Sequence, residues 1–316
     1  MTGLPLVSVV MGVYNGEREL PATLDSIFSQ QGVNFELVVV DDGSTDGTHS
    51  ILAQRASSEP RLKLYRQENG GLTRALIRGC CISNGEFIAR HDVGDVSHPT
   101  RLKRQRDLLA SNPELSFVSC QFLRLGPDRE NLGSPEPADC GKAIIASLTT
   151  DLQKKGMETP HHGSFMFRRS VYDQVGGYRP EFYFAQALDL WSRLIEIGGL
   201  AFVDEVLYEA SFAPGDISAR YRDKELLLRD LILEATQRRR SGRPEDDVLR
   251  RAALVRPDTE ADLKRLDSAA EYFIGNCLYA KGDQAAATYL RRAIAVEPSN
   301  LKAWAKLICS RILHRA

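Results

Sequence analysis

Two short clusters of carboxylates are the side chains of this sequence best suited to chemistry. Asp41 and Asp42 follow one apolar run, and Asp92 and Asp95 follow another. Carboxylates accept hydrogen bonds from the base and ribose of a nucleotide, and they hold a hard cation that bridges phosphate oxygens. Either task suits Asp42 and Asp92. A pair of aspartates in a turn also forms Asx-turns and helix caps, so a structural role stays open for Asp41.

The elements that must position these carboxylates alternate between strands and helices. Short apolar runs rich in β-branched residues predict buried strands, and apolar residues spaced by three and four predict helices between them. The order strand, helix, strand indicates parallel pairing, so the pattern predicts a doubly wound, mostly parallel α/β sheet flanked by helices. Strands are expected at 6–11, 35–40, 62–65 and 87–90, and helices at 20–31, 48–56 and 72–83.

A third polar pair lies at the end of the first predicted strand. Tyr14 and Asn15 follow the apolar run at 6–11, just as the acidic clusters follow the runs at 35–40 and 87–90. Ligands of doubly wound sheets bind beyond the carboxyl ends of the strands. We therefore expect all three groups to converge on one crevice.

Beyond about residue 218 the pattern becomes helical. A charged, leucine-rich helix is expected at 221–240, and two more are expected at 269–279 and 285–295 around a turn at 281–283. The last two helices resemble one tetratricopeptide repeat through Gly275, Ala286, Ala293 and Pro298. We expect an α/β domain at 1–217 and a helical C-terminal region at 218–316, which caps the fold or docks a protein partner.

Six segments, in the correct order, resemble motifs of the family 2 glycosyltransferases, which have the GT-A fold. The resemblance implies an enzyme that moves a sugar from a nucleotide-diphosphate donor, above all a UDP-sugar. The implied acceptor is a glycan, a lipid-linked glycan or a polysaccharide of the cell envelope. The matching segments are 5–15, 36–48 (ELVVVDDGSTDGT), 71–102, 162–169, 175–178 and 189–191.

The same resemblance assigns a nucleotide site. It implies that Tyr14 and Asn15 lie near the base, that Asp42 bonds uracil or ribose, and that Arg74 binds the diphosphate. The complete set implied for the donor is Tyr14, Asn15, Asp41, Asp42, Arg74, Asp92 and His162.

The metal motif of the family lacks one carboxylate here. The motif usually reads Asp-x-Asp-Asp, whereas this sequence reads Asp92-Val93-Gly94-Asp95. The position that commonly binds Mg²⁺ or Mn²⁺ is therefore Gly94. Asp92 and Asp95 remain the candidate metal ligands, because glycine lets the loop bend.

The carboxylate that usually acts as the base is also missing. In the inverting reaction an aspartate takes the proton of the acceptor hydroxyl, and the resemblance places that aspartate at Ala187. Asp189 is the remaining catalytic candidate, but it lies two residues farther on, about 200° around a helix. A structural role is therefore preferred for Asp189. Glu181, on the preceding loop, is another candidate with no better support.

Two adjacent histidines look like a metal pair but are expected to point apart. Neighbouring residues of a strand face opposite sides, so His161 and His162 should not share a site. His162 matches the family and is expected near the diphosphate or the acceptor, with a hydrogen-bonded structural role as the alternative. Arg168 and Arg169 are candidates for binding phosphate, although one of them is expected to be a solvated strand residue.

Composition excludes several other classes of protein. The 316 residues are 43% hydrophobic and 26% charged with a net charge of −1, and no basic stripe with interleaved aromatics predicts nucleic-acid binding. The basic run 238–240 is a solvated helix face or, less often, a phosphate contact. Six cysteines without metal-ligand spacing are expected to be buried free thiols in a reducing cytosol. No secretory leader is recognised, so the expected location is the cytoplasm, including the inner face of the membrane.

Two hypotheses follow from the ordered motifs and the two missing carboxylates. The first is an active glycosyltransferase that uses Mg²⁺ or Mn²⁺. The second is a degenerate GT-A domain that binds a nucleotide sugar or serves as a scaffold subunit, with the C-terminal helices as its docking element. A sugar nucleotidyltransferase is disfavoured, because no glycine-rich, basic phosphate loop lies near the first strand.

Overall fold

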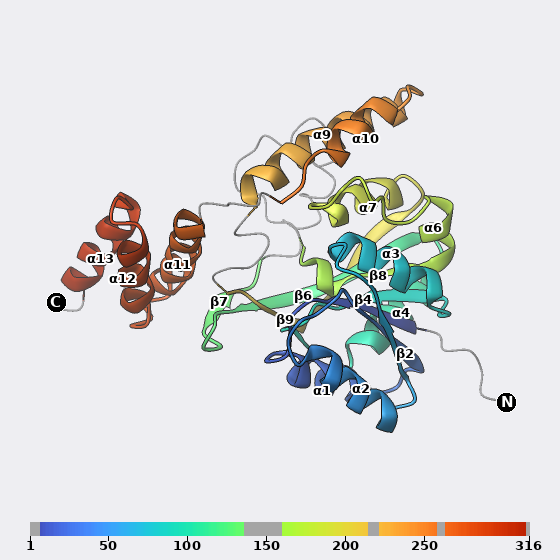
Figure 1. Ribbon diagram of the computed structural model, residues 1–316, viewed down its shortest axis with the longest axis horizontal. Helices are drawn as coiled ribbons and strands as arrows, with labels where there is room; N and C mark the ends of the chain where they lie inside the picture. The colour runs from blue at the N-terminus through green and yellow to red at the C-terminus, as the bar shows by residue number, and fades with distance from the viewer. Residues whose placement is uncertain (1–6, 136–159, 214–220, 258–262, 314–316) are drawn as a thin grey trace. The chain divides into compact units, whose positions relative to one another are not determined.

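The computed structural model describes residues 7–135, 160–213, 221–257 and 263–313 (Figure 1). These residues form two compact units. The first contains the described parts of 1–122, 135–210 and 227–255, and the second contains those of 123–134, 211–226 and 256–316. The domain boundary at residue 217 stays a prediction, although residues 227–255 group with the first unit.

The strands form one mixed sheet. They are β1 (Val7–Val13), β2 (Phe35–Asp41), β3 (Leu62–Arg66), β4 (Phe87–Arg90), β5 (Val96–Ser97), β6 (Leu115–Leu125), β7 (Asn131–Gly133), β8 (Met166–Arg168) and β9 (Gly199–Ser211). Their order is β3-β2-β1-β4-β8-β6-β9-β5, with β7 paired to β6. The strands from β3 to β4 in this order are parallel, whereas β8 pairs antiparallel with β4 and β6. The α/β class predicted from the sequence is confirmed, with antiparallel strands added to a parallel half.

Helices cover both faces of the parallel half. Side chains alternate between the two faces along each strand, so an apolar strand places apolar side chains on both, and both must be buried. On one face Val9 and Met11 of β1 join a buried cluster with Leu24, Leu52 and Leu102. Those leucines come from three helices that lie on the same side of the sheet in Figure 1, namely α1 (Leu20–Phe28), α2 (Thr48–Ser58) and α4 (Arg101–Ser111). The opposite face is covered by α3 (Leu72–Ile82).

Two glycines let α3 approach the sheet closely. A Cβ on Gly79 of α3 would lie 2.6 Å from Cγ1 of Val10, and a Cβ on Gly12 of β1 would lie 3.0 Å from Cβ of Ala75. Both faces are therefore packed, which leaves the carboxyl ends of β1, β2 and β4 as the edge where polar side chains gather.

Four further helices of the first unit follow the sheet's antiparallel half. They are α6 (Arg169–Gln174), α7 (Gln186–Leu194), α9 (Arg222–Arg240), whose first residues belong to the second unit, and α10 (Asp246–Ala253). Helix α7 buries Leu190 and Trp191. The basic run at the end of α9 is paired with carboxylates: Arg238 with Glu234 and Asp247, Arg239 with Glu196 and Glu245, and Arg240 with Glu196. This pairing favours the helix-face interpretation of the run over a phosphate contact.

The second unit contains a helix hairpin where the sequence predicted one. Helices α11 (Leu263–Ala280) and α12 (Ala286–Val296) enclose the expected turn, and α13 (Leu301–Leu313) follows. A Cβ on Gly275 of α11 would lie 2.9 Å from Cγ of Leu290, so glycine permits the close contact of the pair. The likeness of this pair to a tetratricopeptide repeat stays a prediction.

Within the described ranges, no helix combines the length and the apolar character needed to cross a membrane. The five cysteines that the structure describes are free thiols, but the expected burial is found only for Cys80 and Cys120, whereas Cys277 is half-buried and Cys81 and Cys309 are exposed. Cys140 and residues 1–6, which carry the start of the first predicted strand, lie outside the described residues.

Candidate functional site

The acidic loop after β4 is held in place by helix α1. Gly94 has a φ of 92°, a conformation that glycine adopts without strain. Its N–H donates to Thr23 Oγ1 at 2.9 Å, and that hydroxyl donates to the Asp95 carbonyl at 3.1 Å. The backbone between the two aspartates is therefore fixed, and the position that lacks a carboxylate is a turn that favours glycine.

A buried guanidinium controls the charge of Asp92. Arg90 is 0% exposed, donates to the carbonyls of Val10 (3.1 Å) and His91 (2.6 Å), and pairs with Asp92 Oδ1. Burial alone would raise the pKa of Asp92, but the Arg90 charge, aided by two nearby histidines, lowers that pKa below its ordinary value. Asp92 therefore stays ionised at neutral pH.

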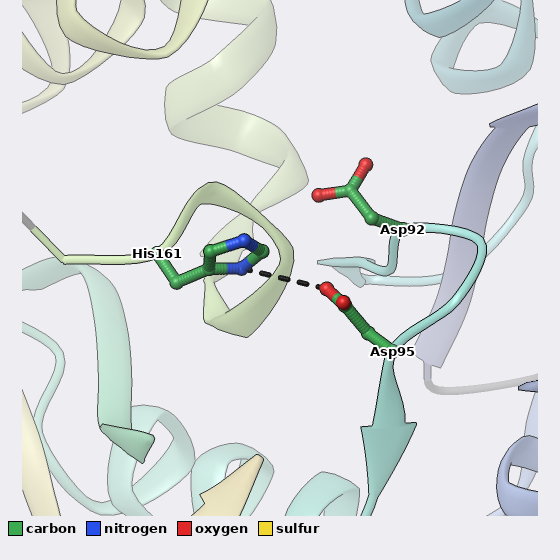
Figure 2. A group of neighbouring side chains, drawn as sticks. All are labelled: Asp92, Asp95 and His161. Carbon is green, nitrogen blue, oxygen red and sulfur yellow. Dashed lines mark ion pairs between the residues drawn. The ribbon is translucent and has the colours of Figure 1, made fainter. Parts of the chain in front are cut away.

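Asp95 and His161 join Asp92 in one cluster (Figure 2). One ligand atom from each of the three side chains lies within 4.8 Å of the others. His161 Nδ1 is 3.6 Å from Asp95 Oδ2, and the Tyr208 hydroxyl donates to the same carboxylate oxygen at 2.6 Å. Two carboxylates and one imidazole form a donor set that suits a divalent cation.

The two histidines point to different partners, as expected, but the local structure and the histidine that joins the acidic cluster differ from the sequence analysis. The chain is not a strand here, because residues His162–Ser164 form a single 3-10 turn that His161 caps. His161, which the strand assumption set aside, is the histidine that joins the acidic cluster. His162 Nε2 instead lies 2.7 Å from the Tyr178 hydroxyl, and burial, with the charge of Arg90, lowers the pKa of His162 well below its ordinary value. The Gly163-Ser164 pair, typical of turns, was the signal that the strand assumption overlooked.

Sequence reasoning also missed the side chains that support the cluster. Arg101 is fully buried, donates to the carbonyls of Arg90 (2.7 Å) and Gly163 (2.8 Å), and lies 4.7 Å from the centre of the Tyr208 ring. It therefore links the end of β4 to the histidine turn and to β9. No local pattern indicates this role, since the partners are distant in sequence.

Asp41 and Asp42 have different surroundings. Asp41 is buried, accepts the N–H of Ser44 at 2.9 Å, and lies 3.1 Å from His49 Nδ1. These contacts match the turn-forming alternative for Asp41. Asp42 accepts hydrogen bonds from Gln67 Nε2 (2.7 Å) and from the N–H groups of residues 70 (3.0 Å) and 71 (2.8 Å). Most of its acceptor capacity thus shapes the loop before α3.

The remaining candidates at this edge are exposed. Tyr14 is 51% exposed, and the Asn15 side chain accepts the N–H of Thr45 at 2.8 Å. Arg74 is exposed and has no ion-pair partner among the residues that the structure describes. A hollow of about 600 Å³ lies beside Asp42 and is lined by Gly43, Arg66, Gln67, Glu68 and Asn69. Tyr14 and Arg74 therefore remain accessible to a ligand.

Asp189 lies in a buried ion-pair cluster. Its carboxylate is 1% exposed and bonds Arg179 Nη2 and Arg193 Nη2, each at 2.5 Å. Burial would raise the pKa of Asp189, but the charges of Arg193 and Arg179 lower it, so the group is a weak proton acceptor. This geometry supports the structural role and opposes a base role. Ala187 and Glu181 are both half-buried, and only Glu181 carries a carboxylate.

The two arginines considered for phosphate bind the scaffold instead. Arg168 donates to the carbonyls of Leu115 (2.9 Å) and Asn112 (3.0 Å). Arg169 donates to the Gly85 carbonyl at 2.6 Å and to the Ser83 hydroxyl at 2.6 Å. Both guanidinium groups are committed to chain segments around β8, so the expected phosphate contact is not supported.

Comparison with known proteins identifies the fold and the family. Residues 8–176 match the family model described as Glycosyl transferase family 2. The chain is 34% identical over 216 residues to the putative glycosyltransferase EpsE of Bacillus subtilis (strain 168), covering 66% of this chain and 74% of the relative. It is 24% identical over 239 residues to an uncharacterized glycosyltransferase of Haemophilus influenzae, covering 71% of each.

Solved structures share the fold at low sequence identity. S. aureus TarS 1-349 in complex with UDP matches with a TM-score of 0.54 and 18% identity, covering 96% of this chain and 88% of that one. The mannosyltransferase PcManGT from Pyrobaculum calidifontis, in complex with GDP-Man and Mn²⁺, matches with a TM-score of 0.57 and 21% identity, covering 98% and 87%. These likenesses establish the GT-A fold.

Proposed function

The chain belongs to the family 2 glycosyltransferases, and from this membership we propose that it transfers a sugar from a UDP-sugar to a glycan, a lipid-linked glycan or a polysaccharide, with inversion. The observation that carries the proposal is the gathering of polar side chains at the carboxyl ends of the adjacent parallel strands β1, β2 and β4. A nucleotide donor is supported by the fold neighbours, which were solved with UDP, UDP-GlcNAc and GDP-Man.

The donor would lie across this edge of the sheet. Tyr14 and Asn15 would meet the base. Asp42 shapes the neighbouring loop, and its Oδ2, which accepts one N–H, would bond the base or ribose. Arg74, exposed and without an ion-pair partner among the described residues, would meet the diphosphate. Asp41 supports the turn, and His162 would lie near the diphosphate or the acceptor.

The acidic loop fits a divalent cation, Mg²⁺ or Mn²⁺. Asp92 and Asp95 would hold the ion, and Arg90 keeps Asp92 ionised for that purpose. When bound, such a cation neutralises charge that develops on a departing diphosphate. The buried guanidinium of Arg90 bonds Oδ1 of Asp92, and among the described residues no hydrogen bond engages Oδ2, which would be the oxygen offered to the ion.

We propose no residue of α7 as the base that takes the proton of the acceptor hydroxyl. The position that commonly carries the base is Ala187, and Asp189 faces two arginines. Glu181, on the segment before α7, stays a candidate. The scaffold hypothesis is less well supported, since the family and its named relatives are glycosyltransferases. Docking of a protein partner through the C-terminal helices also stays a proposal.

Calorimetric titration with UDP tests the donor site. We expect UDP to bind, and Asp42→Ala to weaken binding by about 1–3 kcal/mol, because a buried acceptor is lost and its loop donors are left unpaired. Asp25→Ala is the matched control, since Asp25 is exposed and pairs with Arg55 on the surface. Absence of UDP binding in the folded wild type would overturn the donor assignment. Equal UDP affinity of the wild type and Asp42→Ala would remove Asp42 from the site. Transfer assays with a panel of nucleotide sugars would then identify the sugar.

A further inference from the structure

The acidic loop lacks a carboxylate at a position where the backbone disfavours one. Gly94 has a φ of 92°, which strains any residue with a Cβ, and its N–H is bonded to Thr23. The loop itself therefore offers only Asp92 and Asp95. Mg²⁺ and Mn²⁺ take six ligands, so two carboxylates with a nucleotide's phosphates would leave room for another protein ligand.

His161 turns its Nδ1 atom toward this loop. Its Nδ1 accepts the N–H of Gly163 at 3.2 Å, which places the ring proton of the neutral form on Nε2. The same Nδ1 lies 3.6 Å from Asp95 Oδ2 (Figure 2). A hydrogen bond of 3.2 Å is long, so a cation can replace it at low cost.

Each of the three side chains is held by a different part of the fold. The His161 ring packs between Phe122 and Tyr208, with ring centres 5.6 Å and 5.5 Å away. The Tyr208 hydroxyl orients the Asp95 carboxylate, and Arg90 orients Asp92. Outer contacts of this kind position metal ligands before the metal arrives.

The backbone beside His161 passes so close to the acidic loop that only glycine fits. A Cβ on Gly163 would lie 2.1 Å from the Tyr208 oxygen and 3.0 Å from Asp92 Oδ2. This close approach packs the histidine turn against Tyr208 and Asp92, and it is an observation independent of the His161 ring itself.

We propose that His161 is the third protein ligand of the cation, in place of the carboxylate absent at Gly94, and that this imidazole makes the site prefer Mn²⁺ to Mg²⁺. The inference rests on the proposed function, because the nucleotide's phosphates complete the coordination. Mg²⁺ favours oxygen ligands and dehydrates reluctantly, whereas imidazole nitrogen binds the transition metals more strongly. An all-carboxylate loop would not discriminate in this way.

Metal binding by the full chain tests the proposal without a transfer assay. Titration of the wild type with Mn²⁺ and Mg²⁺ in the presence of UDP should show tighter binding of Mn²⁺, and pulsed electron paramagnetic resonance of bound Mn²⁺ should show coupling to one ¹⁴N nucleus. His161→Ala should lower the Mn²⁺ affinity about tenfold or more, leave Mg²⁺ affinity nearly unchanged, and remove the nitrogen coupling. His98→Ala, at an exposed histidine bonded to Thr100, should change none of these.

Two further measurements keep the proposal distinct from the donor assignment. Far-UV circular dichroism establishes that each variant is folded, and His161→Gln replaces His161→Ala if the alanine variant is not. A folded variant with wild-type Mn²⁺ affinity, or wild-type Mn²⁺ without nitrogen coupling, would overturn the role of His161. Titration with UDP in the absence of metal reports on the donor site separately. If UDP does not bind, the result counts against the proposed function. If UDP binds, the metal titrations remain the test of His161.

Discussion

Asp189→Asn is expected to reduce stability rather than remove a chemical step. The carboxylate joins α7 to the segment before it, since both Arg179 and Arg193 donate to it. The Asp189 side chain is only 1% exposed, so its carboxylate is not open to an acceptor in solvent. The variant keeps the size and shape of the side chain and removes only the charge and one acceptor oxygen.

The magnitude follows from the contacts that the amide cannot make. Arg179 Nε donates to both carboxylate oxygens (3.0 and 3.1 Å), and Arg193 Nη2 donates to Oδ2 at 2.5 Å. Arg179 keeps a second counter-charge in Glu245 at 2.8 Å, but the Nε of Arg193 is already buried without a hydrogen bond. Removal of one partner from a buried ion pair costs about 3–5 kcal/mol, a large part of the roughly 5–15 kcal/mol that stabilises a domain.

Urea unfolding followed by circular dichroism measures this loss. Asp173→Asn, at an exposed carboxylate, should stay within about 0.5 kcal/mol of the wild type. The wild-type contribution of Asp189 should also depend on pH. Because its folded-state pKa lies below the ordinary 3.8, the stabilisation is complete above that value and is lost as the pH falls through the folded-state pKa. An Asp189→Asn variant that is as stable as the wild type but transfers no sugar would refute the structural role and favour a base.

Two other variants test the loop and the helix hairpin. Arg90→Gln should raise the pKa of Asp92, because the variant removes the positive charge that lowers that pKa. The acid limb of the pH profile of the transfer rate should therefore move to higher pH. An unchanged profile in a folded variant would contradict this. Gly275→Ala should destabilise the second unit by about 1–3 kcal/mol, since the added Cβ would meet Leu290 Cγ at 2.9 Å. Helix propensity alone predicts a gain of roughly 0.5–1 kcal/mol for the same change, so the sign of the shift in melting temperature decides between the two.

The parallel half of the sheet was predictable because its signal is local. The β1 and β2 segments are apolar at almost every position, and the helices between them carry regular apolar spacing, so both periods are visible in the sequence. The antiparallel half was not predicted. Its long strands β6 and β9 mix apolar and polar residues, β8 has three residues and β5 has two, and their pairing depends on partners far along the chain.

The candidate site was predictable where it follows a strand and not where tertiary contacts decide. Asp42 and Asp92 were found because each follows an apolar run. Arg90, by contrast, resembles an ordinary polar residue at the end of a strand, yet it is fully buried and sets the charge of Asp92. His161 was excluded by a rule that is correct for strands and does not apply to the turn that this segment forms. Propensity rules describe single elements, whereas these roles arise between elements.

The two missing carboxylates differ in what the structure puts near them. Beside Gly94, a turn from another part of the chain brings the His161 imidazole to a point where its ligand atom and those of both remaining aspartates lie within 4.8 Å of one another. The local backbone would strain an aspartate if one were restored at 94. Beside Ala187, the nearest carboxylate on the same helix is Asp189, which is buried between two arginines. The proposed cation site therefore has a candidate ligand, His161, for the carboxylate absent at 94, whereas α7 offers no substitute for the carboxylate absent at 187. In the proposed reaction, charge neutralisation of the leaving group and deprotonation of the acceptor would then have separate structural origins, and variants at the first site need not affect the second.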